Sequence, residues 1–526
     1  MTSMEPEYHQ FEEYRNRLQK LEEIKALDME PYPHKFSPNA TAKSLKETYK
    51  DKEIGHSDDA ASGSTPSVCL AGRLMLFRAM GKNAFAHIQD HTGRIQLMFN
   101  RDATEVVGYD PEKAPQSPKP IKFIEKKIDL GDIIGVEGNL FRTQKGELTL
   151  FVKKCTLLCK TLLPLPDKHS GLTDKGILYR KRWLDLIINE ETKKRFELRS
   201  KILKIIREYF EESNFLEVET ATLQNIYGGA NAKPFKTHLN ALKQEMYLRI
   251  SLEIPLKKLM VGGFDRVFEI GKVYRNEGID KSHNPEFTLC ESYAAYWDYN
   301  DMMSFIEKLF EKIALKLFNS TEIPMIHEGK EIILDLKAPW KRMTMKEAVS
   351  EYGKIHVDTL SDQEIKDLLK EMTKQNPDDV DKASRGMLIA YLFEEFVEHH
   401  LIQPHHIIDH PIETTPLCKI HRQASEHKEI LVERFESFIL GFEFTNAYTE
   451  LNDPIVQRKL LEQQQDLKEA GDEEAHPFDE EFIEAICQGM PPTGGLGFGV
   501  DRLIMLFTKA ASIRDVILFP LMKGEE

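Results

Sequence analysis

The segment LLPLPDKHSGLTD, residues 162–174, separates two parts of the chain that differ in hydrophobic periodicity. Residues 66–161 contain short stretches in which apolar and polar residues alternate, a pattern typical of β-strands. Beyond the segment, apolar residues recur every three or four positions over several long stretches, which is typical of helices. Its two prolines and polar flanks predict that the segment is a linker. Because 526 residues exceed one ordinary domain, we expect at least two domains.

Residues 66–161 are predicted to form a small closed β-barrel. The stretches SVCLAGRLMLFRAM, AFAHIQD and RIQLMFN are predicted strands, and DHTG is the turn between the last two. Two more strands follow, around a turn at Lys145 and Gly146. Five short strands in about 100 residues are typical of an OB-fold. Residues 1–65 form an extension that begins with a helix over 5–28, because apolar side chains are spaced three and four apart there.

Residues 175–526 are predicted to form a second, larger domain. Helices are predicted at 194–214, 299–319 and, with interruptions, 343–400, and short strands dominate 246–297. Strands joined by hairpin-length links favour an antiparallel sheet flanked by helices. The whole chain is therefore predicted to be an α+β multidomain protein.

Composition excludes several classes of protein. A formal charge of −15 argues against a surface that binds polyanions everywhere, although a local basic groove for nucleic acid remains possible. The sequence contains no run of about 18 apolar residues, so no membrane span is predicted. The polar, acidic N-terminus does not resemble a secretory signal. Six cysteines are too few for a disulfide framework at this length. We therefore expect a cytoplasmic protein without membrane contact.

The segment VYRNEGIDKSHNPEFTLCESY holds an unusual density of polar side chains between apolar ends. Arg275 is suited to a phosphate, because a guanidinium bonds two oxygens at once and stays charged. Phe287, on the strand that returns from the turn, is suited to stack on a flat ring. The segment is thus predicted to be a strand–loop–strand unit that holds a nucleotide. The alternative is a charged edge hairpin with no ligand.

Two later segments add possible ligands. Glu436 and Glu443 provide carboxylates of the kind that Mg²⁺ prefers when it bridges substrate phosphates, although glutamates seven apart are also common on solvated helices. The segment GGLGFGVDRL combines a glycine-rich strand with Arg502 in the first turn of a helix. It lacks the lysine and hydroxyl of a GxxxxGK[ST] phosphate loop.

In this order, FLEVET, YRNEG…HNPEFT and GLGFGVDRL resemble motifs 1, 2 and 3 of the class II aminoacyl-tRNA synthetases. AGRLMLFRAMGKNAF, LPLPDK, YRKRWLDLI, GGANAKPF and RDVILFP extend the resemblance over nearly the whole chain, and it is closest to the class II (class IIb) lysyl-tRNA synthetases. The resemblance implies an ATP-dependent ligase that converts L-lysine to lysyl-adenylate and transfers the lysyl group to the 3′ end of tRNA(Lys). It further implies an anticodon-binding OB-fold, a class II catalytic domain over 175–526, Mg²⁺ as cofactor and a homodimer.

The resemblance also assigns roles to individual residues. Arg275 and Arg502 match the catalytic arginines. The residues that match ATP-binding positions are Arg275, Glu277, His283, Phe287, Glu436 and Arg502. Those that match lysine-binding positions are Gly229, Glu253, Arg275, Glu291, Tyr293, Asn446, Tyr448 and Glu450. Glu436 and Glu443 match Mg²⁺ ligands. In the barrel, the anticodon positions are Phe85, Gln96 and Glu147.

The sequence departs from the family pattern at a few positions. Ala221 stands after EVET, where members usually carry proline in the dimer-forming motif. SLEIP replaces the usual APEL around Glu253, so that Pro255 follows the acid. Lys233 stands where arginine is commoner, and Tyr448 where phenylalanine is common in bacterial members.

Three alternatives differ in substrate or activity. An aspartyl- or asparaginyl-tRNA synthetase shares the fold, but Glu291 and Glu450 would repel aspartate. A lysyl transferase that modifies a protein would lack the barrel, and a non-catalytic nucleic-acid-binding module would not need Arg275. Because two buried acids without a cation are costly, we expect the cation to come from a basic substrate.

Overall fold

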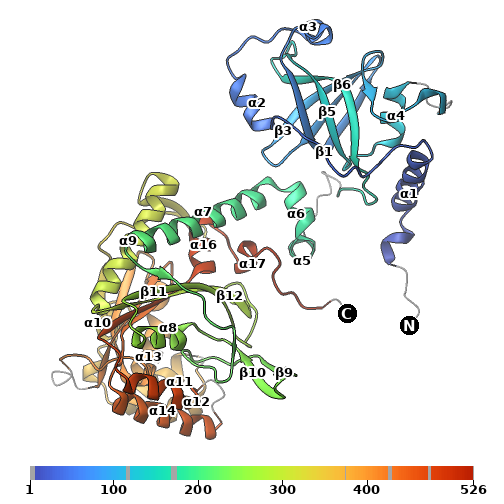
Figure 1. Cartoon of the computed structure of the whole chain (residues 1–526). Coiled ribbons are helices and arrows are strands. Elements are labelled where there is room, and N and C mark those ends of the chain that lie inside the picture. The colour runs from blue at the N-terminus through green and yellow to red at the C-terminus, as the bar shows by residue number, and fades with distance from the viewer. Residues whose placement is uncertain are drawn as a thin grey trace. The chain divides into compact units, whose positions relative to one another are not determined.

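The structure, a computed structural model, describes residues 6–113, 119–166, 174–373, 375–423, 429–471 and 475–524. The chain divides into two compact units, Met1–Thr173 and Asp174–Glu526 (Figure 1). Of the predicted linker 162–174, residues 167–173 lie outside the described residues. A search of the described helices finds none with the length and apolar character needed to cross a membrane.

The first unit begins with short helices that precede the barrel. They are the 3₁₀-helix η1 (Glu7–Gln10), α1 (Glu12–Lys25), α2 (Ala42–Thr48) and α3 (Ser57–Ser62). The helix predicted over 5–28 is in fact two, because Phe11 adopts an extended backbone conformation between η1 and α1. Leu21 and Ile24 of α1 are buried, as the predicted apolar face requires.

The barrel of the first unit confirms the predicted OB-fold architecture. Its strands and flanking helices are β1 (Ser67–Met80), β2 (Asn83–Gln89), β3 (Arg94–Asn100), β4 (Glu105–Val106), η2 (Pro111–Lys113), α4 (Pro120–Lys127), β5 (Ile133–Arg142) and β6 (Leu148–Cys159). The strand order is β3-β2-β1-β5-β6-β4, and the additional parallel pairing of β3 with β6 closes the barrel. Along β2, buried Ala84, Ala86 and Ile88 alternate with outward-facing residues, so one face of the strand is presented on the barrel surface.

The second unit is built on one large sheet. Its strands are β7 (Leu216–Glu217), β8 (Leu223–Gln224), β9 (Lys236–Leu239), β10 (Gln244–Leu248), β11 (Arg266–Tyr274), β12 (Glu286–Ala295), β13 (Glu322–His327), β14 (Lys330–Asp335), β15 (Lys341–Thr344), β16 (His405–Pro411), β17 (Leu431–Ile439), β18 (Phe442–Thr449) and β19 (Thr493–Gly499). Eight of them form the sheet, in the order β15-β16-β17-β18-β19-β12-β11-β7. The predicted antiparallel arrangement is correct except at the edges, where β15–β16 and β11–β7 pair in parallel.

Helices cover this sheet and fill the connections. They are α5 (Lys175–Arg180), α6 (Arg182–Ile188), α7 (Glu190–Glu212), α8 (Glu253–Val261), α9 (Tyr299–Phe318), α10 (Met345–Glu351), η3 (Val357–Thr359), α11 (Asp362–Met372), α12 (Pro377–Lys382), α13 (Arg385–Phe396), η4 (Glu398–His400), η5 (Ile412–Thr414), α14 (Pro454–Glu469), α15 (Glu480–Cys487), α16 (Val500–Thr508) and α17 (Ile513–Val516). In Figure 1, α7 and α16 lie on one side of β11 and β12, and α8 lies on the other.

The two faces of β12 have different neighbours. Cys290 and Ala294 belong to the main apolar core, together with residues of α7, α9 and α16. Tyr293 and Ala295 pack instead with Leu256 and Met260 of α8. Because successive side chains of a strand point to opposite faces, Glu291 lies on the same face as Tyr293. This face carries the candidate site.

Candidate active site

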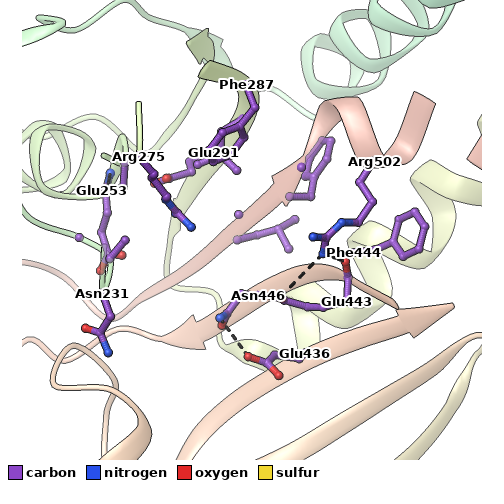
Figure 2. A pocket seen from close by; sticks show the side chains of 18 of the residues that line it. Asn231, Glu253, Arg275, Phe287, Glu291, Glu436, Glu443, Phe444, Asn446 and Arg502 are labelled. Carbon is purple, nitrogen blue, oxygen red and sulfur yellow. Dashed lines mark hydrogen bonds and ion pairs between the residues drawn. The ribbon is translucent and has the colours of Figure 1, made fainter. Parts of the chain in front are cut away.

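One cavity of about 400 Å³ lies over the middle of the sheet in the second unit (Figure 2). It brings together all the residues of this unit that were predicted to bind substrate or metal, from segments more than 200 residues apart in the sequence: Gly229, Glu253, Arg275, Glu277, His283, Phe287, Glu291, Tyr293, Glu436, Glu443, Asn446, Tyr448, Glu450 and Arg502. In Figure 2, Glu253 lies at one end of the cavity, Arg502 and Glu443 lie at the other, and Arg275 extends between them. The roles given to these residues remain predictions.

The first end of the cavity is lined by acids, and we call Glu253, Glu291 and Glu450 the acidic end. Their exposed fractions are 4, 5 and 1%. Glu291 accepts hydrogen bonds from the backbone N–H of Leu252 at 3.0 Å and from the hydroxyl of Tyr293 at 3.4 Å. Burial, with the nearby charge of Glu253, raises the pKa of Glu291 to about 8. The acidic end is therefore arranged for a cation.

Glycines on β19 and beside α8 make room for these acids. A Cβ atom at Gly495 would lie 1.8 Å from Oε1 of Glu450, so this carboxylate occupies the space of the missing side chain. Gly229 has φ +85°, and a Cβ atom there would lie 2.1 Å from the Ser251 hydroxyl. Side chains at either position would displace the walls of the acidic end.

A lysine that sequence reasoning missed completes the acidic end. Nζ of Lys257 lies 2.5 Å from Oε1 of Glu253 and 2.5 Å from Oε2 of Glu450, and its side chain is fully buried. Burial acts to lower the pKa of Lys257, but the two carboxylates hold it above its ordinary value. The expectation that the cation for these acids comes from a basic substrate is therefore wrong for Glu450, because Lys257 already pairs with it. Its spacing of four residues from Glu253 on α8 was the available signal.

Arg275 lies at the centre of the cavity, just after β11. Its guanidinium is 5.2 Å from the centre of the Phe287 ring, and its Nε donates a hydrogen bond to the carbonyl of Ile250 at 3.3 Å. Because β11 and β12 form a hairpin in which Val273 pairs with Phe287, the arginine and the aromatic ring are held side by side. The remaining guanidinium nitrogens face an open cavity that an anionic group can enter.

The second end of the cavity carries two carboxylates on neighbouring strands, not on a solvated helix. Glu436 on β17 accepts hydrogen bonds from Arg434 at 2.5 Å and from Asn446 at 3.2 Å. Although 42% of the Glu443 side chain is exposed, desolvation by the surrounding protein and the charge of Glu436 raise its pKa. Arg502, at the start of α16, donates a hydrogen bond to the backbone carbonyl of Glu443 (Figure 2). Because the charges of these two neighbouring carboxylates repel each other, a bound cation would stabilise the pair.

Arg434 is a further residue that the sequence did not single out. Its Nε donates to Oδ1 of Asn446 at 3.1 Å while its guanidinium pairs with Glu436, and its backbone pairs with Tyr448 across the strands. It therefore fixes the orientation of two predicted ligands. An arginine on a strand, between Glu433 and Phe435, carried no periodic signal that distinguished it from a surface residue.

Two histidines line the cavity in different settings. His283 is exposed on the loop between β11 and β12, where its Nδ1 lies 2.8 Å from Oδ2 of Asp280. Asp280 thus holds the imidazole of His283 in place on this loop. His476, which was not predicted, is buried near Lys257, and burial lowers its pKa to about 4. It is therefore neutral at physiological pH.

The three barrel residues predicted to read a nucleic acid lie on one surface of the first unit. Phe85 packs against Met98, Phe141 and Phe151 but is only partly buried. Gln96, opposite His87 in the β2–β3 pairing, accepts a hydrogen bond from Thr149 at 3.0 Å. Glu147 and His87 approach to 3.9 Å. A partly exposed ring beside amide and carboxylate groups is suited to an unpaired base.

Comparison with known proteins gives full-length similarities. A family model described as "tRNA synthetases class II (D, K and N)" matches residues 174–523, and one described as "OB-fold nucleic acid binding domain" matches residues 68–158. The lysine–tRNA ligase of Chlamydia pneumoniae is 55% identical over 523 residues, which are 98% of each chain. The lysine–tRNA ligase of Nostoc punctiforme is 45% identical and covers 97% of this chain and 87% of its own. That of Methanoculleus marisnigri is 44% identical and covers 96% and 94%.

Proposed function

Because the chain belongs to the class II tRNA synthetases, we propose that it activates L-lysine with ATP and transfers the lysyl group to tRNA(Lys). The full-length relatives named lysine–tRNA ligase support this function. The observation that carries the choice of amino acid is the acidic end of the cavity, which lies beside Arg275. An ε-ammonium group needs buried carboxylates at one fixed depth, and Glu291 and Glu450 provide them.

In the first step, the carboxylate of lysine attacks the α-phosphate of ATP. The new C–O–P linkage forms as the bond to pyrophosphate breaks, and no protein nucleophile is required. Arg275 bridges the amino-acid carboxylate and the α-phosphate, with Asn446 as a second donor to the carboxylate. Glu253 binds the α-ammonium group, near Gly229. Catalysis then comes mainly from orientation and from stabilisation of charge at the transition state.

The nucleotide is proposed to bind between Phe287 and Arg502. The Phe287 ring stacks on one face of adenine, and the guanidinium of Arg502 covers the other. Glu277 and His283, from the loop between β11 and β12, contact the adenine edge and the phosphates. The Asp280–His283 pair presents the imidazole toward the cavity mouth.

Mg²⁺ is proposed to bind at Glu436 and Glu443. The donor set fits, because two neighbouring carboxylates face the cavity and the pKa of Glu443 is raised beside Glu436. Among the described residues no cluster of three or more histidine, cysteine or acidic side chains is suited to hold a metal, so substrate phosphates would complete the coordination. When bound, the ion supplies positive charge that stabilises pyrophosphate as a leaving group. Arg434 and Asn446 hold Glu436 in place for this role.

The second step transfers the lysyl group to the 3′ adenosine of the tRNA, and the barrel is proposed to select that tRNA by its anticodon. Phe85 stacks on the central anticodon base, while Gln96 and Glu147 bond to base edges. Thr149 orients the amide of Gln96 through its hydroxyl.

The function is tested by amino-acid-dependent pyrophosphate exchange with all twenty amino acids. We expect exchange with lysine and none with aspartate or asparagine. Exchange with aspartate alone would establish the aspartyl alternative. Binding of tRNA without any exchange would establish a non-catalytic module, and lysylation of a protein in place of tRNA would establish a protein-modifying transferase.

Replacing Phe85 by alanine is expected to weaken tRNA charging by about 1–3 kcal/mol, or roughly five- to 150-fold in kcat/KM for tRNA. The loss arises because one stacking surface disappears from the barrel. Lysine-dependent exchange should be unchanged, since Phe85 lies in the first unit. Phe85→Tyr keeps a ring and should charge tRNA almost normally. An equal loss of charging and exchange would mean that the ring is only structural.

The KM for lysine is expected to fall as pH rises from about 6 to about 8, by up to about tenfold per unit, and then to level off. Burial raises the pKa of Glu291 from 4.5 to about 8, so the free site holds a proton below that pH. The ε-ammonium of lysine requires the ionised carboxylate, and binding therefore releases the proton. Exchange kinetics measured across this range check the slope, and a flat profile would contradict the assignment.

We further propose a homodimer in the cytoplasm. Motif 1 contributes Leu216 and is followed by Leu223 and Ile226, and these three apolar side chains are 43–49% exposed. Their exposure is suited to a partner surface. All six cysteines are free, in keeping with a reducing compartment. Light scattering on the purified chain tests the dimer and the effect of Ala221 on it.

A further inference from the structure

A lysine of the protein itself lies behind the acidic end and pairs with two of its acids. Lys257 lies on α8, one turn after Glu253, and is fully buried. Its ammonium group bridges Glu253, on its own helix, and Glu450, which follows β18. The ring of Phe482 from α15 lies 6.0 Å from Nζ. Residues of α8, of the segment after β18 and of α15 thus surround the ammonium group of Lys257 behind the cavity.

The charges around this cation match the proposed substrate. When lysine is bound and its binding has released the proton of Glu291, the residues Glu253, Glu291 and Glu450 carry three formal negative charges, and Lys257 cancels one of them. The two that remain correspond to the α- and ε-ammonium groups of one lysine molecule, while its carboxylate is left for Arg275. Without Lys257 the cavity would hold one negative charge more than its substrate can neutralise, and a buried unpaired carboxylate takes up a proton instead.

The contacts also fix which oxygens are left for the substrate. Lys257 engages Oε1 of Glu253 and Oε2 of Glu450. Both oxygens of Glu450 are buried and have no hydrogen-bond partner of good geometry among the described residues, although Oε2 lies within ion-pair distance of Lys257. Oε1 sits where a side chain of residue 495 would otherwise lie. A buried acceptor without a partner is costly, so this oxygen is prepared for a donor that arrives with the ligand.

We propose that Lys257 is a specificity-determining positioning residue, whose ammonium group pairs with Glu253 and Glu450 and holds their carboxylates in the orientation that receives the two ammonium groups of lysine. This inference rests on the proposed function and extends it to a residue outside the cavity lining. The alternative is that Lys257 only supports the packing of α8 against α15, in which case its aliphatic stem and not its charge would matter.

The test is chemical rescue of Lys257→Ala. The variant removes the ammonium group and leaves a space behind Glu253 and Glu450. We expect kcat/KM for lysine in pyrophosphate exchange to fall at least about tenfold, with the KM for ATP changed less than about twofold. Ethylammonium or propylammonium ions at millimolar concentrations should restore a large part of the loss. Propanol, which has a similar shape and no charge, should restore none.

The neighbouring Lys258 provides the matched control. It is on the same helix and pairs with Glu481 at 2.8 Å, away from the cavity lining. Lys258→Ala should leave lysine activation unchanged and should not respond to alkylammonium ions. If Lys257→Ala does not fold, Lys257→Met retains the stem, and it should raise the KM for lysine at least about tenfold while sparing the KM for ATP.

Each result has one meaning. Rescue by the ammonium ions alone supports the proposal. Normal lysine activation in folded Lys257→Ala or Lys257→Met, equal rescue by propanol, or a defect that no ion relieves would overturn it. The wild-type enzyme is assayed in parallel: if it fails to activate lysine, the proposed function is wrong, whereas a wild-type enzyme that activates lysine leaves only the role of Lys257 in question.

Discussion

Replacing Arg275 by alanine is expected to lower lysine-dependent pyrophosphate exchange by about three powers of ten or more. Arg275 extends between the acidic end and the Glu443–Arg502 end of the cavity (Figure 2), so both reactants depend on one guanidinium. In the proposed mechanism, its two donor edges bond the lysine carboxylate and the α-phosphate when negative charge develops at the transition state. The loss should therefore appear in kcat as well as in both KM values.

The control for this experiment is Arg266, at the start of the same strand β11. Its guanidinium lies 4.7 Å from the Trp297 ring and donates to the carbonyl of Ser213, outside the cavity. Arg266→Ala should reduce the melting temperature without a comparable loss of exchange. Arg275→Lys keeps the charge but loses the planar fork, and should recover only part of the activity. Near-normal exchange by Arg275→Ala would remove this residue from the mechanism.

Replacing Glu291 by glutamine is expected to lower kcat/KM for lysine about 100-fold, the magnitude of a lost charge-assisted contact in a buried site. The substitution keeps the volume of the side chain and an oxygen for the N–H of Leu252. It removes the negative charge that is proposed to face the ε-ammonium group. The KM for ATP should change little, because Glu291 lies at the acidic end.

The same variant also tests the pH dependence. Glu291→Gln has no carboxyl group to titrate, so the fall in KM between about pH 6 and about pH 8 should become shallower. Glu286→Gln is the control: this residue is on the same strand and lies 3.5 Å from Lys272, outside the cavity lining. It should leave both the affinity and the pH profile unchanged. An unaltered profile in Glu291→Gln would assign the titration to another group.

The fold was largely predictable because its elements have strong local patterns. Alternating polarity located β1, β2 and β3 to within a residue or two, and three-to-four spacing located α7 and α16. Which strands pair, and over what length, was harder to predict from the sequence. Within FLEVET, for example, only Leu216 and Glu217 pair, in parallel, with Val267 and Phe268. Polarity along a segment does not specify how much of a distant strand lies beside it.

Site residues that belong to sequence motifs were predictable. Residues that join the site only through contacts in the folded chain were not. Resemblance alone led to Glu253, Glu291 and Glu450. Lys257 escaped because a lysine next to Lys258 in an amphipathic helix is usually solvated, and only its contact with Glu450, 193 residues later, identifies it as buried. Arg434, on β17, escaped because only its contacts with Glu436 and Asn446 connect it to the site. Residues that act on other site residues carry little sequence signal of their own.

The alternation along β12 has a consequence for how this enzyme acquires activity as it folds. If the strand slipped by a single position against β11 or β19, the Cys290 thiol would replace Glu291 in the cavity, and the carboxylate would enter the apolar layer beneath α9. Such a mispaired chain would be both unstable and unable to recognise an amino acid. The register of this one strand therefore determines both whether the chain is stable and whether it presents a carboxylate to the amino acid.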